Sequence, residues 1–262
     1  MGSVCTSKKS VLLVTARPTP ESRSKDPAQE RAELKQLFEE ESALMNRKVK
    51  SCFEQVFAGE ASGVSEINMK FFNLGEAGAL HLTKVLPYFT ALKSLRLWKT
   101  KLGIEGAKLL GAVLPRLPQL SILSLEDNEI KAEGVSYIAG SLGYLIDLQE
   151  LYLHVNKMGQ EGVTALSSVL AAKSSLRILT IDENQIGKAG LMTLLTSLAN
   201  CLDKLTLLGL AFNQLGDEGA TELLTIFKVM IALRKMTLSG NNITPTMERQ
   251  LASAAPSVEF LF

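Results

Sequence analysis

The stretch Leu148–Ser175 reads LQELYLHVNKMGQEGVTALSSVLAAKSS, and it decides the fold of the chain. It begins with L-x-x-L-x-L-x-x-N-x-M, in which alternating leucines indicate a short strand with one buried face. A G-x-E-G turn follows, and then apolar residues at helical spacing predict an amphipathic helix. The pattern returns about 28 residues earlier and later, so most of the chain is one strand–helix unit stacked on itself.

Seven such strand segments align along the chain, and a partial eighth is expected within Val258–Phe262. Their first apolar positions are Val64, Leu92, Leu120, Leu148, Leu176, Leu205 and Leu233. Five segments end in an asparagine, whose buried amide can bond backbone groups that a turn leaves unsatisfied. These residues are Asn128, Asn156, Asn184, Asn213 and Asn241. Phe72 and Thr100 stand there in the first two repeats, so we expect the asparagine row to be irregular at that end.

Glycine recurs at two places in the unit. The first opens the turn after the strand, at Gly75, Gly103, Gly159, Gly187 and Gly216, and Lys131 replaces it in the third repeat. The second comes three residues later, at Gly78, Gly106, Gly134, Gly162, Gly190 and Gly219. Because glycine is costly inside a helix, its recurrence at helix starts predicts a close approach of helix to strand.

These repeats resemble the leucine-rich repeat family, and their length is similar to that of the ribonuclease-inhibitor-like class. The resemblance covers Val64 to the last residue. It implies an α/β fold: a leucine-rich repeat solenoid shaped as a right-handed horseshoe, with parallel strands on the concave face and helices on the convex face. Stacked repeats of this kind create extended concave surfaces that bind partners.

The composition is that of a globular protein and excludes several classes. The 262 residues are 46% hydrophobic and 21% charged, with a net charge of +1, which argues against binding to nucleic acid. The cysteines Cys5, Cys52 and Cys201 lack metal-ligand or disulfide-framework spacing, which indicates a reducing compartment. No apolar run approaches the roughly 20 residues of a membrane-spanning helix. The run Val11–Val14 is too short for the core of a signal peptide.

The first ten residues, MGSVCTSKKS, match the pattern M-G-x-x-x-[ST] for N-myristoylation of Gly2. One acyl chain holds a membrane only marginally, so stable attachment needs a second signal. Cys5 can accept palmitate, and Lys8 and Lys9 suit an anionic cytoplasmic leaflet. The alternative is a chance match, with Cys5 a free thiol in a disordered tail. The anchor predicts the cytoplasmic face of a membrane, with the plasma and the ciliary or flagellar membrane both consistent; without it the protein is cytoplasmic.

We divide the chain into three parts. Residues 1–25 are expected to be an acylated, disordered tail and linker, 26–63 a helical N-terminal cap, and 64–262 about seven repeats with a C-terminal cap. Asp26 and Pro27 begin the cap helix, Gly59 ends it, and a break is expected near Ser42–Arg47. This lead-in either covers the hydrophobic side of the first repeat or binds a partner.

The outward strand positions form the candidate partner-binding surface on the concave face. Its first strands are basic and aromatic, with Phe71 among them, and its middle is acidic. The candidate residues are Lys70, Arg96, Trp98, Lys99, Glu126, Asp127, Tyr152, His154, Asp182, Glu183 and Phe212. An exposed Trp beside Arg and Tyr has the composition of an interface hot spot. The alternative is an ordinary solvated face, whose opposite charges on neighbouring strands stabilise the sheet.

Glu126, His154 and Asp182 fall in one row of this face on neighbouring strands. Two carboxylates beside a histidine can orient it as a base or bind a metal with it. No nucleophile, phosphate loop or enclosing pocket accompanies them, so we expect no catalytic residue, no metal site and no cofactor. We expect acidic neighbours to hold His154 charged. His81, on an outer helix, carries no functional signal, and Cys201 is expected to be packed.

The sequence therefore favours a non-enzymatic, monomeric adaptor that is anchored to a membrane by its N-terminus and binds a protein on strands Arg96–Glu183. One alternative is a GTPase-activating-like regulator of a small GTPase, which the family resemblance implies for some members with this repeat length. Another is a cytosolic inhibitor or sensor that wraps one target. Ribonuclease inhibitors are cysteine-rich and acidic and this chain is neither, which counts against the last reading.

Overall fold

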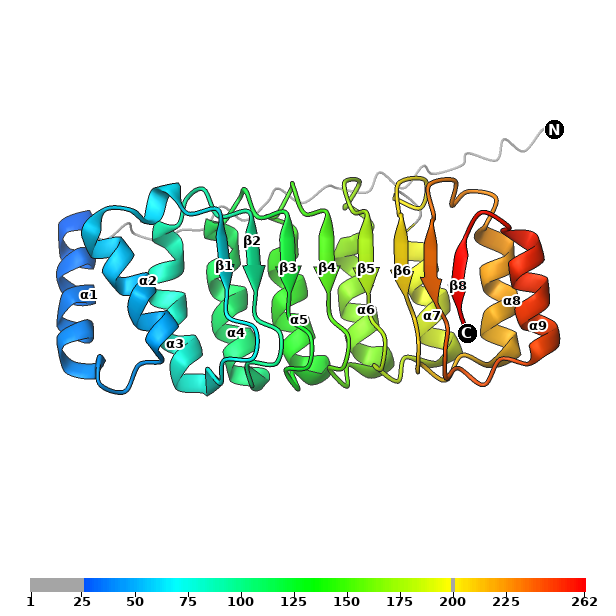
Figure 1. The fold of residues 1–262 in the computed structure, drawn as a ribbon, viewed down its shortest axis with the longest axis horizontal. Helices are drawn as coiled ribbons and strands as arrows, with labels where there is room; N and C mark the ends of the chain where they lie inside the picture. Colours follow the sequence, from blue (N-terminus) through cyan, green and yellow to red (C-terminus); the bar gives the residue numbers. More distant parts are fainter. Residues whose placement is uncertain (1–25, 199–200) are drawn as a thin grey trace, which may run out of the picture.

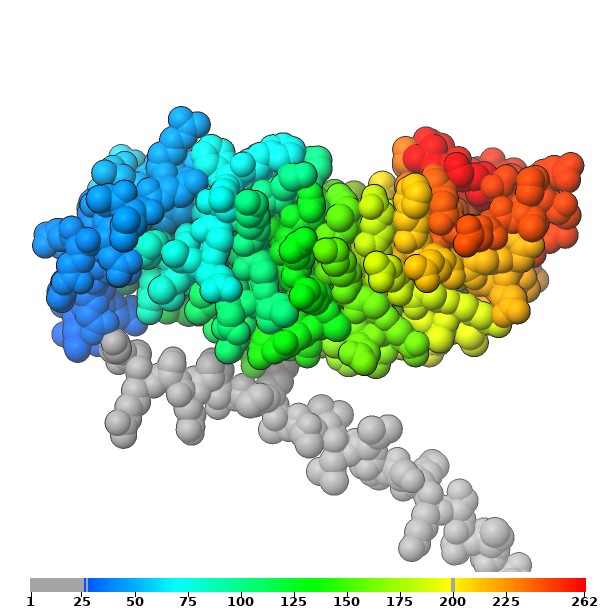
Figure 2. Space-filling view, turned by 90° about the horizontal axis from the view of Figure 1, so that it is seen from below, coloured from blue at the N-terminus to red at the C-terminus, as the bar shows by residue number. Residues whose placement is uncertain are grey.

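The computed structural model describes residues 26–198 and 201–262, and these form one parallel sheet backed by helices. The sheet has eight strands in the order β1-β2-β3-β4-β5-β6-β7-β8, which is the order of the chain. Figure 1 shows the strands side by side along the long axis with the helices behind them. Figure 2, viewed along the strands, shows the repeats in sequence order and a shallow hollow on the strand side between the two ends. The predicted α/β solenoid is confirmed.

Each strand is three residues long, and one helix follows each of the first seven. The strands are β1 Glu66–Asn68, β2 Ser94–Arg96, β3 Ile122–Ser124, β4 Glu150–Tyr152, β5 Ile178–Thr180, β6 Leu207–Gly209, β7 Lys235–Thr237 and β8 Glu259–Leu261. The helices are α3 Gly75–Val85, α4 Gly103–Val113, α5 Lys131–Leu142, α6 Gly159–Leu170, α7 Gly187–Ser197, α8 Gly216–Ile226 and α9 Pro245–Ala254. Short 3₁₀ turns, η2 Leu86–Tyr88 and η3 Leu114–Arg116, extend α3 and α4. The expected eighth strand is therefore present.

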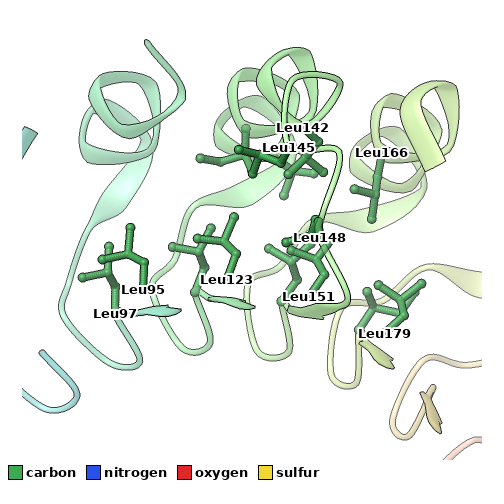
Figure 3. Close-up of a cluster of buried hydrophobic side chains, with 14 of the residues drawn as sticks. Leu95, Leu97, Leu123, Leu142, Leu145, Leu148, Leu151, Leu166 and Leu179 are labelled. Atoms are coloured by element: carbon green, nitrogen blue, oxygen red, sulfur yellow. The ribbon is translucent and has the colours of Figure 1, made fainter. Parts of the chain in front are cut away.

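The strand register stacks the leucines of successive repeats. Leu95 pairs with Leu123, Leu123 with Leu151, and the row continues through every strand of the sheet. Figure 3 shows the side chains of Leu95, Leu123, Leu151 and Leu179 turned toward the helices, where they meet Leu142 and Leu166. These side chains are fully buried. Each Å² of apolar surface that is buried stabilises the fold by about 25 cal/mol, so this continuous core is the main stabilising contribution.

The asparagines form a buried ladder beside the core. The Asn156 carboxamide oxygen accepts from the amides of Asn128 (3.1 Å) and Ile130 (3.4 Å), and its nitrogen donates to the carbonyl of Leu125 (2.9 Å). The same bonds recur at the other asparagines, one repeat apart. At the N-terminal end the Thr100 hydroxyl donates to the oxygen of Asn128 (2.9 Å), and no further rung follows at Phe72 among the described residues. The expected irregularity is confirmed.

The two glycine positions have different causes. The first glycine of each turn has a left-handed backbone, with φ between 57° and 65°, and Lys131 adopts φ 56° in its place. The second glycine is closely surrounded: a Cβ on Gly134 would lie 2.9 Å from Cβ of Ile130 and 3.1 Å from Cβ of Ala107. These atoms belong to its own turn and to the preceding helix. The predicted close approach to a strand is therefore wrong, and the approach is to the turn and the neighbouring helix.

Two further helices precede the first strand. Helix α1 (Pro27–Glu41) begins at the N-cap Asp26, and α2 (Arg47–Ala58) ends at Gly59, which has φ 81°. The expected break is present between them. Phe38 of α1 packs on the α2 rings of Phe53 (centroids 5.6 Å apart) and Phe57 (5.4 Å). Helix α2 in turn buries its apolar face against the first repeat, and the short turn η1 (Ala61–Gly63) leads into β1.

Candidate functional site

The concave face is built by two outward positions of each repeat and one turn residue. Backbone bonds continue beyond the three-residue strands, as from the amide of Phe71 to the carbonyl of Trp98 (2.9 Å) and from Lys99 to Glu126 (2.8 Å). These bonds align the side chains of neighbouring repeats in rows. One turn residue from each of the first six repeats lies beside these rows. These residues share a left-handed backbone, with φ between 51° and 63°: Phe71, Lys99, Asp127, Val155, Glu183 and Phe212.

Three rings make up what we term the aromatic row: Phe71, Trp98 and His154. The ring centroids of Phe71 and Trp98 lie 4.8 Å apart, and those of Trp98 and His154 lie 6.2 Å apart. The ammonium of Lys70 lies 5.4 Å from the Trp98 ring, which permits a cation–π contact. Phe71 is 63% exposed although it is large and apolar. The structure thus brings together the aromatic candidates of the first repeats and leaves their outer surface open.

Charged side chains surround the aromatic row and pair locally. The ammonium of Lys99 lies 3.0 Å from the Asp127 carboxylate, and Arg96 lies 3.4 Å from Glu66 on the preceding strand. Because these pairs are partly exposed, each contributes little to stability. The Tyr152 hydroxyl donates to Glu150 (2.8 Å), and burial, followed by this carboxylate, raises the pKa of Tyr152. Tyr152 is therefore a neutral phenol at physiological pH.

Two acidic candidates are held along the concave face by hydrogen bonds and do not extend into solvent. Glu126 is only 5% exposed and accepts a hydrogen bond from the Ser124 hydroxyl. Asp182 accepts from the backbone amide of Ala211 (2.7 Å) and from the hydroxyl of Thr237, two strands away. It reaches Thr237 because Gly209 lies between them, and a Cβ at Gly209 would overlap the carboxylate. Both groups therefore organise the face from within.

His154 differs from our expectation. Its Nδ1 lies 3.2 Å from the Thr180 hydroxyl, and its ring packs against Trp98. Glu126 and Asp182 are hydrogen-bonded to other groups, and within the described residues no ion pair joins either carboxylate to the imidazole, so the expected contacts of His154 with its acidic neighbours are not formed. The physical reason is that serine, threonine and backbone donors satisfy these carboxylates instead. Among the residues that the structure describes, no group of histidine, cysteine and acidic side chains could hold a metal ion.

The remaining candidates lie apart from the aromatic row. Phe212, two repeats beyond His154, is 54% exposed and packs over Gly240, whose φ is 68°. Glu183 is exposed on the fifth repeat. Gly2, Cys5, Lys8 and Lys9 lie outside the described residues.

Sequence reasoning missed two buried polar groups. His81 is 3% exposed and lies 2.5 Å from the Glu41 carboxylate, so it ties α1 to α3. Lys173 is also 3% exposed, and its ammonium donates to the carbonyl of Leu145 (2.6 Å). Burial lowers the pKa of Lys173. The signal for Lys173 was in the repeat alignment, because the equivalent positions are apolar: Phe89, Leu117, Leu145, Cys201 and Met230.

The described cysteines are inert core residues. Cys52 and Cys201 are both buried free thiols, and burial raises the pKa of each to about 11. The expectation that Cys201 is packed is confirmed. In the described part of the chain, no helix has the length and apolar character to cross a bilayer.

This chain is similar to one family profile and to several solved structures. The profile of the family described as Leucine Rich repeat matches residues 118–139 and 203–224. Similar solved structures are actin-binding site 2 of leiomodin-1 (15% identity, 70% of this chain and 88% of that chain, TM-score 0.45) and the tropomodulin C-terminal domain of Caenorhabditis elegans (15%, 58% and 92%, 0.49). An internalin of Listeria monocytogenes is also similar (17%, 78% and 62%, 0.43). No curated protein matches this chain.

The stacked strand–helix units and their buried asparagine ladder define the chain as an open α/β solenoid. With the matched repeats, it is a leucine-rich repeat protein.

Proposed function

We propose that this protein is a non-enzymatic scaffold that binds a protein partner on its concave face and is held at the cytoplasmic face of a membrane by N-terminal acylation. The observation that carries the binding role is the aromatic row, in which the exposed Phe71 packs on the half-buried Trp98 with Lys70 and Lys99 at the border. Large aromatic side chains beside cationic ones dominate the energetics of protein interfaces.

The chemistry of this surface suggests the complementary feature of the partner. Phe71 presents an exposed ring to an incoming apolar side chain, and Lys70 lies beside it to meet a carboxylate, whereas Lys99 is already paired with Asp127 and would have to exchange that partner. Glu126 and Asp182 are bonded internally and add little to the accessible charge. The partner segment we propose therefore has an apolar residue flanked by acidic residues, and it contacts the first four strands.

A capture experiment tests the binding role. The wild-type protein, Trp98→Ala and Tyr137→Ala are used as baits under identical conditions. Tyr137 is a matched control, because it is an exposed aromatic residue on the outer helix α5. Loss of a hot spot of about 2 kcal/mol lowers affinity roughly 30-fold. A partner that Trp98→Ala loses and Tyr137→Ala keeps supports the proposal, whereas equal capture by all three baits contradicts it.

The membrane anchor is tested separately. Gly2 within M-G-x-x-x-[ST], Cys5 beside it, and Lys8 and Lys9 supply the two signals that stable attachment requires. The intact protein, Gly2→Ala and Cys5→Ser are compared by membrane fractionation, and intact-mass measurement detects the acyl groups. The two variants test the two acylation sites separately. Wild type in the membrane fraction and soluble Gly2→Ala support the anchor. Absence of acyl mass with all three proteins soluble refutes it and leaves the binding role intact.

The alternative of a GTPase regulator rests on the resemblance of the scaffold, and no contact among the described residues favours it. A GTPase stimulation assay separates it from the scaffold. The scaffold proposal predicts that the protein binds its partner without stimulating GTP hydrolysis.

A further inference from the structure

A groove lies on the helix side of the solenoid at its N-terminal end, away from the concave face. It has a volume of about 530 Å³ and runs between α1 and the outer surfaces of α3 and α4. That volume falls within the range of about 300–1,000 Å³ that is typical of ligand sites. Its apolar lining includes Leu34 and Leu37 of α1, Leu80 of α3 and Leu109 of α4.

Leu80 distinguishes this surface from that of the next three helices. It is 40% exposed, two residues after the second glycine of its repeat. The equivalent residues of the next three helices are polar, namely Lys108, Ser136 and Thr164. Leu80 therefore faces the groove rather than the core of the array. Together with the other leucines of the lining, it forms a contiguous apolar concavity of the kind that marks an interaction surface.

We propose that the groove binds a segment of this same chain, Val11–Val14, which no other feature of the protein uses. Its sequence is VLLV, the most apolar run before the first helix. Chain connectivity places it within reach, because α1 begins at Asp26 and Glu30, one turn later, already lines the groove. The eleven intervening residues, 15–25, can extend about 36 Å.

Tethering makes even a weak contact effective. A short linker gives the attached segment an effective concentration in the millimolar range. Four apolar side chains in a leucine-lined groove therefore need no high intrinsic affinity to be bound most of the time. The same segment on a separate molecule would have to reach that concentration in solution.

The charges match along one wall of the groove. Helix α1 carries five glutamates against two basic residues, and its Glu30 and Glu33 line the groove, whereas Lys84 and Arg116 lie on the wall formed by α3 and η3. The segment is flanked by basic residues, with Lys8 and Lys9 before it and Arg17 after it. Docking would thus place apolar side chains on the leucines and basic flanks along the acidic helix. This inference does not depend on acylation and stands separately from the concave site.

Disulfide trapping tests the proposal in the full-length chain. In a Cys5→Ser background, Leu12→Cys is combined with Leu80→Cys, or with Met192→Cys as the control. Met192 is a matched site, because it occupies the position of Leu80 in helix α7 and is 45% exposed. Cys52 and Cys201 can remain, since both are buried. Under mild oxidation of dilute protein, we expect Leu12→Cys to link within one chain at least ten-fold faster to Leu80→Cys than to Met192→Cys.

Equal rates at the two sites, or no bond at Leu80→Cys, would overturn the proposal. A disulfide-linked dimer whose yield rises with concentration would also overturn it, because it would make a second copy the occupant. Hydrogen exchange provides a test without new cysteines. Val11–Val14 should be protected in the wild type and should lose at least ten-fold of that protection in Leu80→Glu. An unprotected segment in the folded wild type refutes docking.

Discussion

Replacing Asn156 by alanine should reveal how much of the solenoid depends on its asparagine ladder. Asn156 is fully buried. Three backbone groups have its side chain as their hydrogen-bond partner: the amides of Asn128 and Ile130 and the carbonyl of Leu125. Alanine leaves all three buried without a partner. Its nitrogen also donates to Leu153 (2.9 Å), a carbonyl that Asn184 shares.

The expected cost follows from these three groups. A buried donor or acceptor without a partner costs about 1–3 kcal/mol, so Asn156→Ala should lose roughly 3–9 kcal/mol of unfolding free energy. That is a large fraction of the roughly 5–15 kcal/mol that stabilises a typical protein. The upper part of this range would prevent folding, and the lower part leaves a measurable transition.

Urea unfolding monitored by circular dichroism measures the loss, and hydrogen exchange shows where it falls. The control is Asn73→Ala, because Asn73 is an exposed asparagine of the first turn, and its replacement should change stability by less than about 0.5 kcal/mol. Exchange should accelerate first at Asn128 and Ile130, whose amides lose their acceptor. A loss below about 1 kcal/mol, or unchanged exchange at these two amides, would refute the account of the ladder.

Three further substitutions test individual contacts. Lys131→Gly should raise the unfolding free energy by about 1 kcal/mol, because Lys131 has φ 56° where the equivalent residues are glycines; a lower melting temperature would contradict this. Lys173→Met should stabilise by about 1 kcal/mol or more at pH 7, because a buried ammonium is replaced by an apolar group. Burial lowers the pKa of Lys173, so the unfolded chain binds its proton more tightly and the stability of the wild type rises with pH. The difference in unfolding free energy between wild type and Lys173→Met should therefore close as the pH approaches about 10.4. A difference that does not depend on pH would contradict this account of Lys173. Gly209→Ala should displace the Asp182 carboxylate and lower the unfolding free energy by about 2 kcal/mol, and by much less in an Asp182→Ala background. A double-mutant cycle of urea unfolding measures this coupling, and equal losses in the two backgrounds would show that the two residues are not coupled.

The repeat pattern predicted the strands, the core and the ladder because each depends on local spacing alone. A strand residue such as Leu151 faces inward because side chains alternate between the two faces of a strand. The aligned residues of the neighbouring strands must face the same way for the repeats to stack. The break between α1 and α2 also followed from the sequence. The reason for the second glycine did not, because Gly134 is crowded by Ala107 of the preceding helix, which belongs to the repeat before it.

The side-chain directions on the concave face could not be predicted from spacing. Asp182 binds Thr237 only because Gly209 leaves the intervening strand bare, so its direction depends on two other repeats. Glu126 turns to Ser124 on its own strand. The link between His81 and Glu41 depends on how α1 lies against α3, and no periodicity in the chain specifies that angle. Position in a row is thus encoded locally, whereas the hydrogen bonds of Asp182 and His81 depend on other repeats and helices.

These internal bonds change which part of the concave face can recognise a partner. By position alone, the acidic middle and the aromatic first strands look equally available. Glu126 and Asp182 are already hydrogen-bonded within the face, which leaves the exposed Phe71 on Trp98 as the main apolar contact surface, while Phe212 lies two repeats beyond the aromatic row. The groove beside α1 lies at the same end of the array. Both proposed contacts therefore involve the first repeats, and the later repeats supply the stacked core and ladder that hold those strands in register.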